Sequence, residues 1–440
     1  MSEQNQPAVT PDNGTRSTRK IRFNAFDMNC VAHQSPGLWR HPSDRSWNYN
    51  TIDYWVDLAR LLETGGFDGL FIADVLGTYD VLSGTDEAAI RQGSQIPVND
   101  PLLLVSAMAH ATKNLGFGVT TATGFEHPYP FARRMSTLDH LTRGRVGWNV
   151  VTGYLPSGAR NMGDDDQLAH DDRYDHADEY LTVLYKLWEG SWERDAVRRD
   201  REAGIFADPA KVHHIGHEGK HFKVPGIHLS EPSPQGSPVI YQAGASPRGR
   251  RFAAENAEAI FVAAPTKAIP RDVVSKIREE LVLAGRDPYD AKIYALLTII
   301  TDSTPEAARA KAAEYQSYAS EGGALVFMSG WMGIAPELQH RRADRQRGEQ
   351  RHPVGGRRVP AGLGERRGVA RPRHRGLGRH RRYGPRPDRL GRRGRRAAAG
   401  LGGRDRRRRL QRRVRRHPGF LRGHRHPRDP RPRAPRRLRP

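Results

Sequence analysis

Short apolar runs alternate with amphipathic stretches from residue 20 to about residue 320. The runs are continuous, which is typical of strands buried on both faces of a parallel sheet, and the stretches between them have the period of helices. The runs that predict strands are 20–28, 67–75, 115–123, 145–153, 237–245, 257–265 and 291–300. The stretches that predict helices are 51–67, 100–114, 130–142, 247–257, 270–284 and 304–319.

This line of strand–helix units predicts the fold class. Strands that alternate with helices favour a parallel sheet, and seven units favour a closed (β/α)8 TIM barrel over an open sheet. We expect the eighth unit after about residue 335, where the composition changes abruptly. The predicted organisation is therefore a disordered segment at 1–19, a barrel at 20–335 with an insertion at about 154–236, and a disordered tail at 336–440 in place of the eighth unit.

The tail has an unusual composition. Residues 341–440 contain 38 Arg, no Lys and 6 acidic residues, a net charge of +32, whereas residues 1–340 carry 34 basic and 43 acidic residues, a net charge of −9. The tail also lacks Ser, Thr, Asn, Ile, Met, Trp and Cys. Because Arg, Gly, Pro and Ala have GC-rich codons, we interpret the tail as an out-of-frame translation that begins near residues 335–340. Sequencing the DNA across codons 330–345 tests this hypothesis, and an intact frame would contradict it.

The net charge of the whole chain, +23, also raises the alternative of a nucleic-acid-binding protein. Such binding would depend strongly on salt and would be lost when residues 341–440 are deleted. The charge lies in the anomalous tail while the body is acidic, so we expect no nucleic-acid partner.

The body has the composition of a cytoplasmic protein without disulfides. No apolar run approaches the roughly 20 residues that a membrane helix needs. No basic and then apolar leader precedes Lys20. Cys30 is the only cysteine, which excludes an intrachain disulfide and a cysteine-based zinc site. We therefore expect a cytoplasmic location and no membrane contact.

Polar residues follow several of the predicted strands at their carboxyl ends, where TIM barrels collect their chemistry. Asp74 follows the second strand, Thr120 ends the third and Asn149 lies in the fourth. The fifth strand leads through Ala245 and Ser246 into a helix whose first turn carries two arginines. The amides of a helix start, a hydroxyl and guanidinium groups can form a phosphate site. The alternative for Ser246 is ordinary helix capping, and the alternative for Asp74 is a loop acid.

The insertion contains "LAHDDRYDHADEYL" at 168–181. His170 and Tyr174 are four residues apart, so on a helix they share one face and could contact one anion. The acidic residues around them raise the alternative of a calcium site, but their spacing does not match an EF-hand loop, and acids are favoured near a helix start in any case. We assign no metal here.

A second motif in the insertion, "HEGKH" at 217–221, matches the pattern of zinc proteases. That chemistry needs both histidines on one face of a helix. Gly216 and Gly219 disfavour a helix, and the segment continues with alternating apolar residues and a proline. We predict a β-hairpin that separates the two histidines, and no zinc.

With these residues in place, the chain resembles the flavin-dependent monooxygenases of the bacterial luciferase-like superfamily. The group that it resembles contains the large subunits that oxidise nitrilotriacetate, dibenzothiophene sulfone and dimethyl sulfide, and residues 24–42 look most like the dimethyl-sulfide enzymes. The resemblance runs from about Ile21 to Ile334. Its motifs are "SPGLWRHP" (35–42), "FDGLFIAD" (67–74), "STLDHLTRGRVGWNVVTG" (136–153), "HDDRYDHADEYL" (170–181), "FADPAKVHHI" (206–215) and "SPQGSPVIYQAGASPRGRRFA" (233–253).

The resemblance implies a cofactor site for reduced FMN at the barrel mouth. The matching cofactor-binding positions are Asp74, Thr120, His170, Tyr174, Ala245 and Ser246. Among them, the phosphate ligands would be His170, Tyr174 and Ser246, while Asp74 and Thr120 would hold the ring or the ribityl chain. In this family the flavin activates O₂ and transfers one oxygen atom to the substrate, so we assign no catalytic side chain and place His33 on the substrate side.

The resemblance also implies partners. The reduced FMN would come from a separate NADH:FMN oxidoreductase, since the chain has no G-x-G-x-x-G turn between a strand and a helix. We expect a homo-oligomer. We also expect a small organosulfur substrate rather than a tricarboxylate, because the loop after the first strand offers only Arg40 and Arg45 to bind carboxylates. Two further alternatives remain, which are a deazaflavin-dependent oxidoreductase on the same barrel and an inactive frame-shifted product.

Overall fold

The computed structural model describes residues 20–263 and 268–333. The predicted frame shift, the eighth unit and the tail at 336–440 lie outside the described residues, as does the segment at 1–19. The boundaries predicted for the domains stay predictions.

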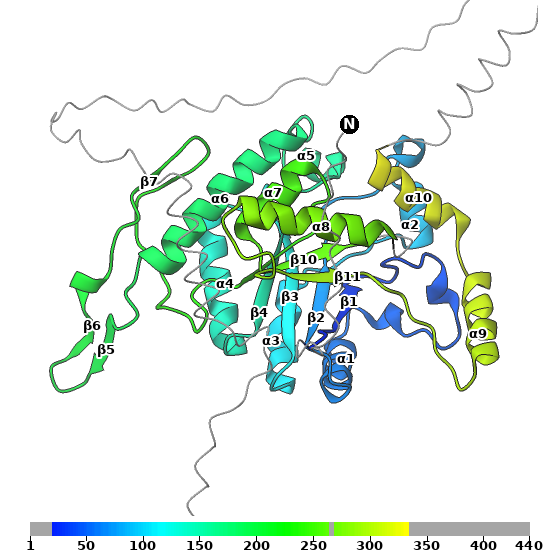
Figure 1. Cartoon of the computed structure of the whole chain (residues 1–440), viewed down its shortest axis with the longest axis horizontal. Coiled ribbons are helices and arrows are strands. Elements are labelled where there is room, and N and C mark those ends of the chain that lie inside the picture. Colours follow the sequence, from blue (N-terminus) through cyan, green and yellow to red (C-terminus); the bar gives the residue numbers. More distant parts are fainter. Residues whose placement is uncertain (1–19, 264–267, 334–440) are drawn as a thin grey trace, which may run out of the picture.

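Seven parallel strands form one curved sheet at the centre of the molecule (Figure 1). Every strand run predicted from the sequence contains one of them, and the observed strands are shorter than the runs. The order in the sheet is β1 (Asn24–Met28), β2 (Gly69–Ala73), β3 (Gly116–Ala122), β4 (Val146–Val151), β9 (Val239–Gln242), β10 (Ala259–Val262) and β11 (Lys292–Ala295). This half-barrel is compatible with the predicted TIM-barrel fold.

Helices follow the strands and, apart from α9 and α10, cover the outer face of the sheet; α9 has no buried residue, and α10 packs against α2. Those with a predicted counterpart are α1 (Ile52–Thr64), α3 (Leu102–Ala111), α4 (Pro128–Thr142), α7 (Pro247–Asn256), α8 (Ala268–Leu283) and α9 (Pro305–Ser317). The periodicity missed α2 (Glu87–Gln92), α5 (Pro156–Asn161) and α10 (Glu321–Met332). The last of these lacks a polar face, because after Glu321 it continues with two glycines and then with mainly apolar residues. The Ser320 hydroxyl caps it by accepting from Gly323 N at 3.0 Å.

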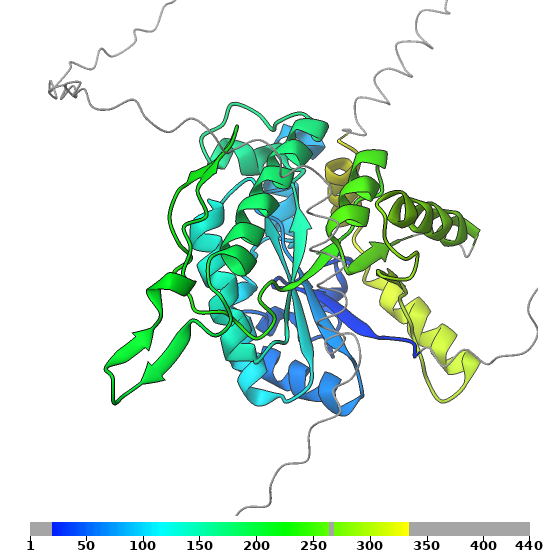
Figure 2. The same ribbon diagram turned by 60° about the vertical axis from the view of Figure 1, so that its left-hand side comes forward.

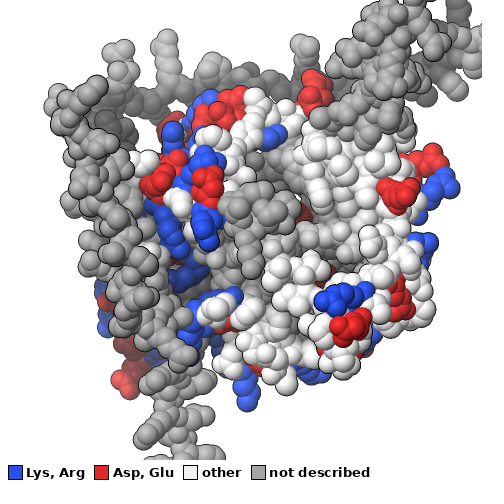
Figure 3. Space-filling model, turned by 45° about the vertical axis from the view of Figure 1, so that its right-hand side comes forward, with Lys and Arg blue, Asp and Glu red and all other residues white. Residues whose placement is uncertain are grey.

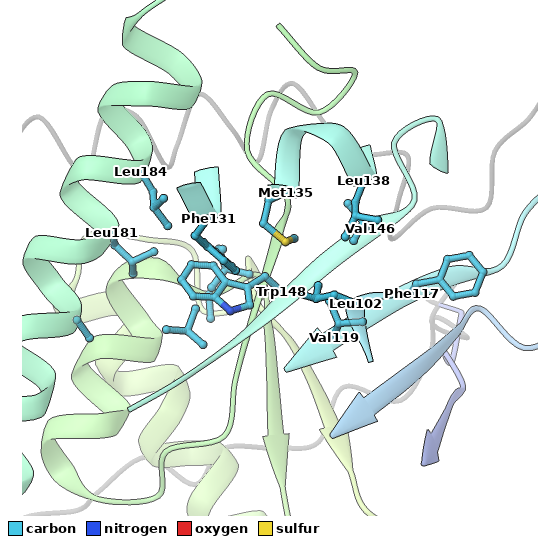
Figure 4. Close-up of a cluster of buried hydrophobic side chains, with 14 of the residues drawn as sticks. Leu102, Phe117, Val119, Phe131, Met135, Leu138, Val146, Trp148, Leu181 and Leu184 are labelled. Atoms are coloured by element: carbon cyan, nitrogen blue, oxygen red, sulfur yellow. The ribbon is translucent and has the colours of Figure 1, made fainter. Parts of the chain in front are cut away.

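The longest helix, α6 (His170–Gly190), belongs to the insertion between β4 and β9 and packs beside α4 (Figure 2). Phe131 of α4, Trp148 of β4 and Tyr180 of α6 join these elements through ring contacts with centroids 4.6–6.0 Å apart. Figure 4 shows the Trp148 ring between α4 and α6. The Trp148 indole N–H donates to the Thr121 carbonyl at 3.0 Å, so this buried ring also has its polar atom satisfied.

The inner face of the sheet is closed by a second aromatic group. Tyr241 and Phe261 stack with ring centroids 5.4 Å apart, and Phe71 and Tyr294 contact Phe261. Both faces of the central strands are therefore buried, which explains why their sequences are continuous apolar runs.

The rest of the insertion forms two hairpins, β5 (Val197–Asp200) with β6 (Ile205–Ala207) and β7 (His217–Glu218) with β8 (Lys223–Val224). The first stands apart from the sheet in Figure 1. The second contains "HEGKH" and confirms the predicted hairpin. His217 contacts Glu179 at 3.1 Å, while the His221 ring packs against His176, so the two histidines have different surroundings.

Charged side chains lie in mixed groups of both signs on the face drawn in Figure 3, with uncharged surface between them. This is the distribution expected for a body with nearly balanced acidic and basic residues. Within 20–263 and 268–333, none of the helices has the length and apolar character needed to cross a membrane.

Arg145 is a buried charge that ties α3 and α4 together. Its side chain is 6% exposed and donates to the carbonyl oxygens of Ala109, Thr112, Leu115 and Thr142 at 2.7–3.2 Å. Three of these oxygens lie at helix ends, where unpaired carbonyls and the helix dipole favour a cation. The arginine therefore satisfies acceptors that would otherwise be buried without donors.

We predict that Arg145→Met lowers the free energy of unfolding by about 3 kcal/mol or more, because it leaves these carbonyls without partners. Urea denaturation followed by circular dichroism measures this loss. Arg309→Met in α9, where the arginine is exposed, is the matched control and should change stability by less than about 0.5 kcal/mol. Equal effects of the two substitutions would contradict the role of Arg145.

Candidate active site

The predicted site residues meet at the edge of the sheet where the parallel strands end. The register pairs Thr120 of β3 with Asn149 of β4, and Asn149 with Tyr241 of β9. Asp74 directly follows β2, and the turn that contains Ser246 follows β9. Because all these strands point in one direction, their polar ends share one rim of the half-barrel.

One end of this rim is formed by the start of α7 and the start of α6. The Ser246 hydroxyl accepts a hydrogen bond from Gly249 N at 3.0 Å and so caps α7. The same oxygen lies 3.3 Å from Nε2 of His170, the first residue of α6. The capping alternative for Ser246 is therefore correct, and the structure also confirms that Ser246 and His170 lie together.

Tyr174 completes this group one turn further along α6. Its ring lies 5.2 Å from that of His170, and its hydroxyl is 3.4 Å from Gln242 Nε2. A Cβ added at Gly244 or Gly249 would come within 2.8 or 2.7 Å of the hydroxyl oxygen, so only glycine fits at these positions. Burial raises the pKa of Tyr174, which keeps the hydroxyl protonated and able to donate a hydrogen bond.

We call His170, Tyr174, Ala245, Ser246 and the α7 N-terminus the cradle. It offers an imidazole, two hydroxyl groups and the backbone amides of a helix start to one small volume. These groups suit an anion such as a phosphate, since several donors converge and the helix dipole favours negative charge.

The expectation that the arginines of α7 belong to this anion site is wrong for this structure. Arg248 forms ion pairs with Asp175 at 2.9 Å and Asp178 at 2.7 Å. Arg250 donates to the Ala245 carbonyl at 2.5 Å. The acceptors of Arg248 belong to a helix about 70 residues away in the chain, which the local sequence does not specify.

The middle of the rim carries a buried acceptor without a partner. The Asn149 amide donates from Nδ2 to the Thr120 hydroxyl at 3.1 Å, and this bond fixes the orientation of the amide. Its Oδ1 atom has no hydrogen-bond partner although Asn149 is only 4% exposed. Because buried polar atoms are almost always paired, this oxygen points to a ligand that brings an N–H group.

Asp74 lies at the other end of the rim. Burial raises the pKa of its carboxyl to about 7, and the nearby Asp100 adds to this shift while a hydrogen bond from the Val75 backbone opposes it. At neutral pH the group is therefore close to half protonated and can donate a hydrogen bond as well as accept one.

A cavity of about 260 Å³ opens beside Asp74. It is lined mainly by apolar side chains, together with three carboxyl groups and one guanidinium group. Arg134 pairs with Glu126 at 2.9 Å, which leaves Asp74 and Asp100 without a basic neighbour in the lining. Glu126 and Arg134 could not be predicted as site residues, because they follow the third strand in no recognisable motif. The apolar lining includes Val75, Leu76, Val98, Leu102, Phe125 and Leu155.

His33 does not line this cavity. Its ring packs edge-on against Phe26 with centroids 4.4 Å apart, and its carbonyl accepts from Gln95 at 2.8 Å. Burial lowers the pKa of His33 to about 4, so the imidazole is neutral at physiological pH. Its assignment to the substrate side stays a prediction.

In the part of the chain that the structure describes, no group of three or more His, Cys, Asp or Glu side chains is arranged to hold a metal ion. The donors of the rim are hydroxyl, amide and imidazole groups spread from β2 to α7. They suit an extended organic ligand with a phosphate at one end.

Comparisons with known proteins agree with this geometry. A model of the family described as luciferase-like monooxygenase matches residues 25–373. The dimethyl-sulfide monooxygenase of Hyphomicrobium sulfonivorans is 56% identical over 316 residues, which are 72% of this chain and 66% of the relative. The long-chain alkane monooxygenase of Geobacillus thermodenitrificans is 54% identical over 316 residues and 72% of each chain. Nitrilotriacetate monooxygenase component A of Aminobacter aminovorans is 36% identical over 62% of this chain and 61% of its own.

Solved structures show the same fold. The crystal structure of a long-chain alkane monooxygenase has a TM-score of 0.71 and 53% identity, covering 72% of this chain and 73% of its own. A riboflavin lyase with modified FMN and riboflavin has a TM-score of 0.68 and 38% identity, covering 71% of this chain and 70% of its own. This chain spans about two thirds of the length of the curated relatives that it matches. It belongs to the luciferase-like monooxygenase family.

Proposed function

We propose that this chain is the oxygenase component of a two-component monooxygenase that uses reduced FMN and O₂. The observation that carries the proposal is the rim of donors and acceptors that ends in the cradle. Bound reduced FMN would supply the electrons and activate O₂ for transfer of one oxygen atom to the substrate. The protein binds and orients the cofactor and excludes water.

The residues present fit FMN at both ends. The cradle suits the phosphate, because His170 and Ser246 are within 3.3 Å of each other and Tyr174 keeps its hydroxyl proton. The unpaired Asn149 Oδ1 suits an N–H of the flavin ring, and protonated Asp74 suits a ring or ribityl acceptor. In this assignment the residues at the ends of β2 to β4 would hold the flavin ring, and those at the starts of α6 and α7 would hold the phosphate.

The substrate that we propose is a small uncharged organosulfur compound of the dimethyl-sulfide type. The cavity beside Asp74 is mainly apolar, and its unpaired carboxyl groups would repel a tricarboxylate. Relatives named for dimethyl sulfide and dibenzothiophene sulfone are 56% and 43% identical to this chain, against 36% for the relative named for nitrilotriacetate.

The residues of the cradle lead to a prediction on the affinity of the chain for FMN. His170→Ala and Tyr174→Phe each remove one hydrogen bond to a charged phosphate, so each should weaken FMN binding about ten- to a hundredfold and riboflavin binding little. Fluorescence titration with the two flavins measures this difference. As a control in the middle of the rim, Asn149→Leu should weaken the binding of both flavins alike. Equal losses of FMN and riboflavin in the His170 and Tyr174 variants would place the phosphate elsewhere.

The raised pKa of Asp74 generates a prediction on stability. A carboxyl group with a folded-state pKa of about 7 stabilises the fold while it is protonated, and this contribution is lost as the pH rises through 7. Asn cannot ionise, so Asp74→Asn does not lose this contribution. Its free energy of unfolding relative to the wild type should therefore rise between about pH 4 and pH 7 and stay constant above pH 7. Urea denaturation at pH 5 and pH 8 measures it. A larger gain at pH 5 than at pH 8 would contradict the assignment.

The two-component arrangement predicts a dependence on a second protein. The prediction concerns a version of the chain with the reading frame restored after residue 335, because we expect the 440-residue sequence, with its anomalous tail, to be inactive in the same assay. With NADH, FMN and O₂ alone, the frame-corrected chain should oxidise dimethyl sulfide negligibly, because it has no nucleotide-binding turn of its own. Adding an unrelated NADH:FMN reductase should start dimethyl-sulfide oxidation, measured as substrate loss by gas chromatography. The reductase alone is the control. NADH oxidation by the chain without a reductase would contradict the proposal, and activity with a reduced deazaflavin in place of FMN would support the alternative cofactor.

A further inference from the structure

Arg248 connects the two helices that build the cradle. It is the second residue of α7, and its Nη2 atom donates to Asp175 at 2.9 Å and to Asp178 at 2.7 Å on α6. Its guanidinium carbon also lies 5.3 Å from the centre of the Tyr174 ring. The side chain is 17% exposed, so these contacts are partly shielded from water. One residue of α7 therefore contacts three residues of α6.

This contact bears directly on the geometry of the cradle. His170 and Tyr174 come from α6, whereas Ser246 caps α7, and the paired residues Arg248 and Asp175 are 73 positions apart in the chain. The spacing of the cradle is thus set by packing between helices rather than by local sequence. Arg248 pairs with α6 at the same turn of α7 whose amides face the cradle.

The pair also changes the local charge. Asp175 and Asp178 lie five and eight residues after His170 on the same helix, and without a counter-ion their carboxylates would repel a phosphate dianion. Burial lowers the pKa of Arg248, but its hydrogen bonds to Asp175 and Asp178 outweigh this and raise the pKa above its ordinary value. The guanidinium group stays charged and reduces the net charge of this group of three side chains from −2 to −1.

Building on the proposed function, we propose that Arg248 is a positioning residue for the flavin phosphate. It does not contact the phosphate. It holds α6 against α7 at the separation that the phosphate bridges, and its positive charge reduces the negative charge of Asp175 and Asp178. The preference of the site for FMN over riboflavin then depends on a residue that does not contact either flavin.

The test compares the affinities of FMN and riboflavin in variants of the whole chain. Arg248→Met keeps an unbranched side chain and removes the charge. We expect it to raise the Kd of FMN roughly tenfold, the effect of one charge-assisted interaction, and that of riboflavin less than about twofold. Arg248→Lys keeps the charge but not the planar guanidinium group that contacts both carboxylates, so the FMN affinity of this variant should lie between those of the wild type and Arg248→Met. Arg251→Met removes one charge from an exposed position of α7 and should leave both affinities unchanged.

A triple variant separates the proposed role from a direct contact. Arg248→Met combined with Asp175→Asn and Asp178→Asn removes the carboxylates along with their counter-ion, so it should recover roughly threefold or more of the lost FMN affinity. If Arg248 binds the phosphate itself, the triple variant stays as weak as Arg248→Met. If Arg248 only supports the fold, both flavins lose affinity equally. Either result overturns the proposal.

The outcomes also distinguish this proposal from the function on which it rests. A wild-type chain that binds FMN no better than riboflavin contradicts the phosphate site itself. A wild-type chain that prefers FMN, together with an Arg248→Met variant that keeps this preference, contradicts only the role of Arg248. Circular dichroism of each variant shows that it is folded before the titration.

Discussion

The aromatic packing of Trp148 with Phe131 and Tyr180 is the interaction on which the site depends. These rings join β4, α4 and α6 in one buried cluster, with centroids no more than 6.0 Å apart. Strand β4 carries Asn149 beside Trp148, and α6 carries Tyr174 two turns before Tyr180. Because close-packed aromatic cores deform little, this cluster fixes the distance between the middle of the rim and the cradle.

The second constraint is the direction of the strands. Parallel strands bring all their carboxyl ends to one rim, so apolar residues can fill both faces of the sheet while the polar residues gather where the sheet stops. The rim combines a phosphate-type cradle, an unpaired amide oxygen and a carboxyl group with a pKa of about 7. In the proposed function, this combination would hold an extended cofactor along one rim of the scaffold.

The sequence predicted the parts of this arrangement that depend on local pattern. Continuous apolar runs gave all seven strands, and the four-residue spacing of His170 and Tyr174 placed both on one face of a helix. It could not predict the partners of Arg248, because the choice between a phosphate and Asp175 with Asp178 depends on how α7 packs on α6. The unpaired oxygen of Asn149 was equally hidden, since it follows from one side-chain rotamer that Thr120 fixes. Helix α10 was missed because it has no polar face.

The central claim is that the cofactor phosphate lies between the starts of α6 and α7. A crystal structure of the chain with FMN tests it most directly. We expect phosphate oxygens within about 3.2 Å of the Ser246 and Tyr174 hydroxyl oxygens. We also expect Asn149 Oδ1 to face a ring N–H and Arg248 to be still paired with α6. A phosphate bound at another helix start, or held directly by Arg248, would contradict it.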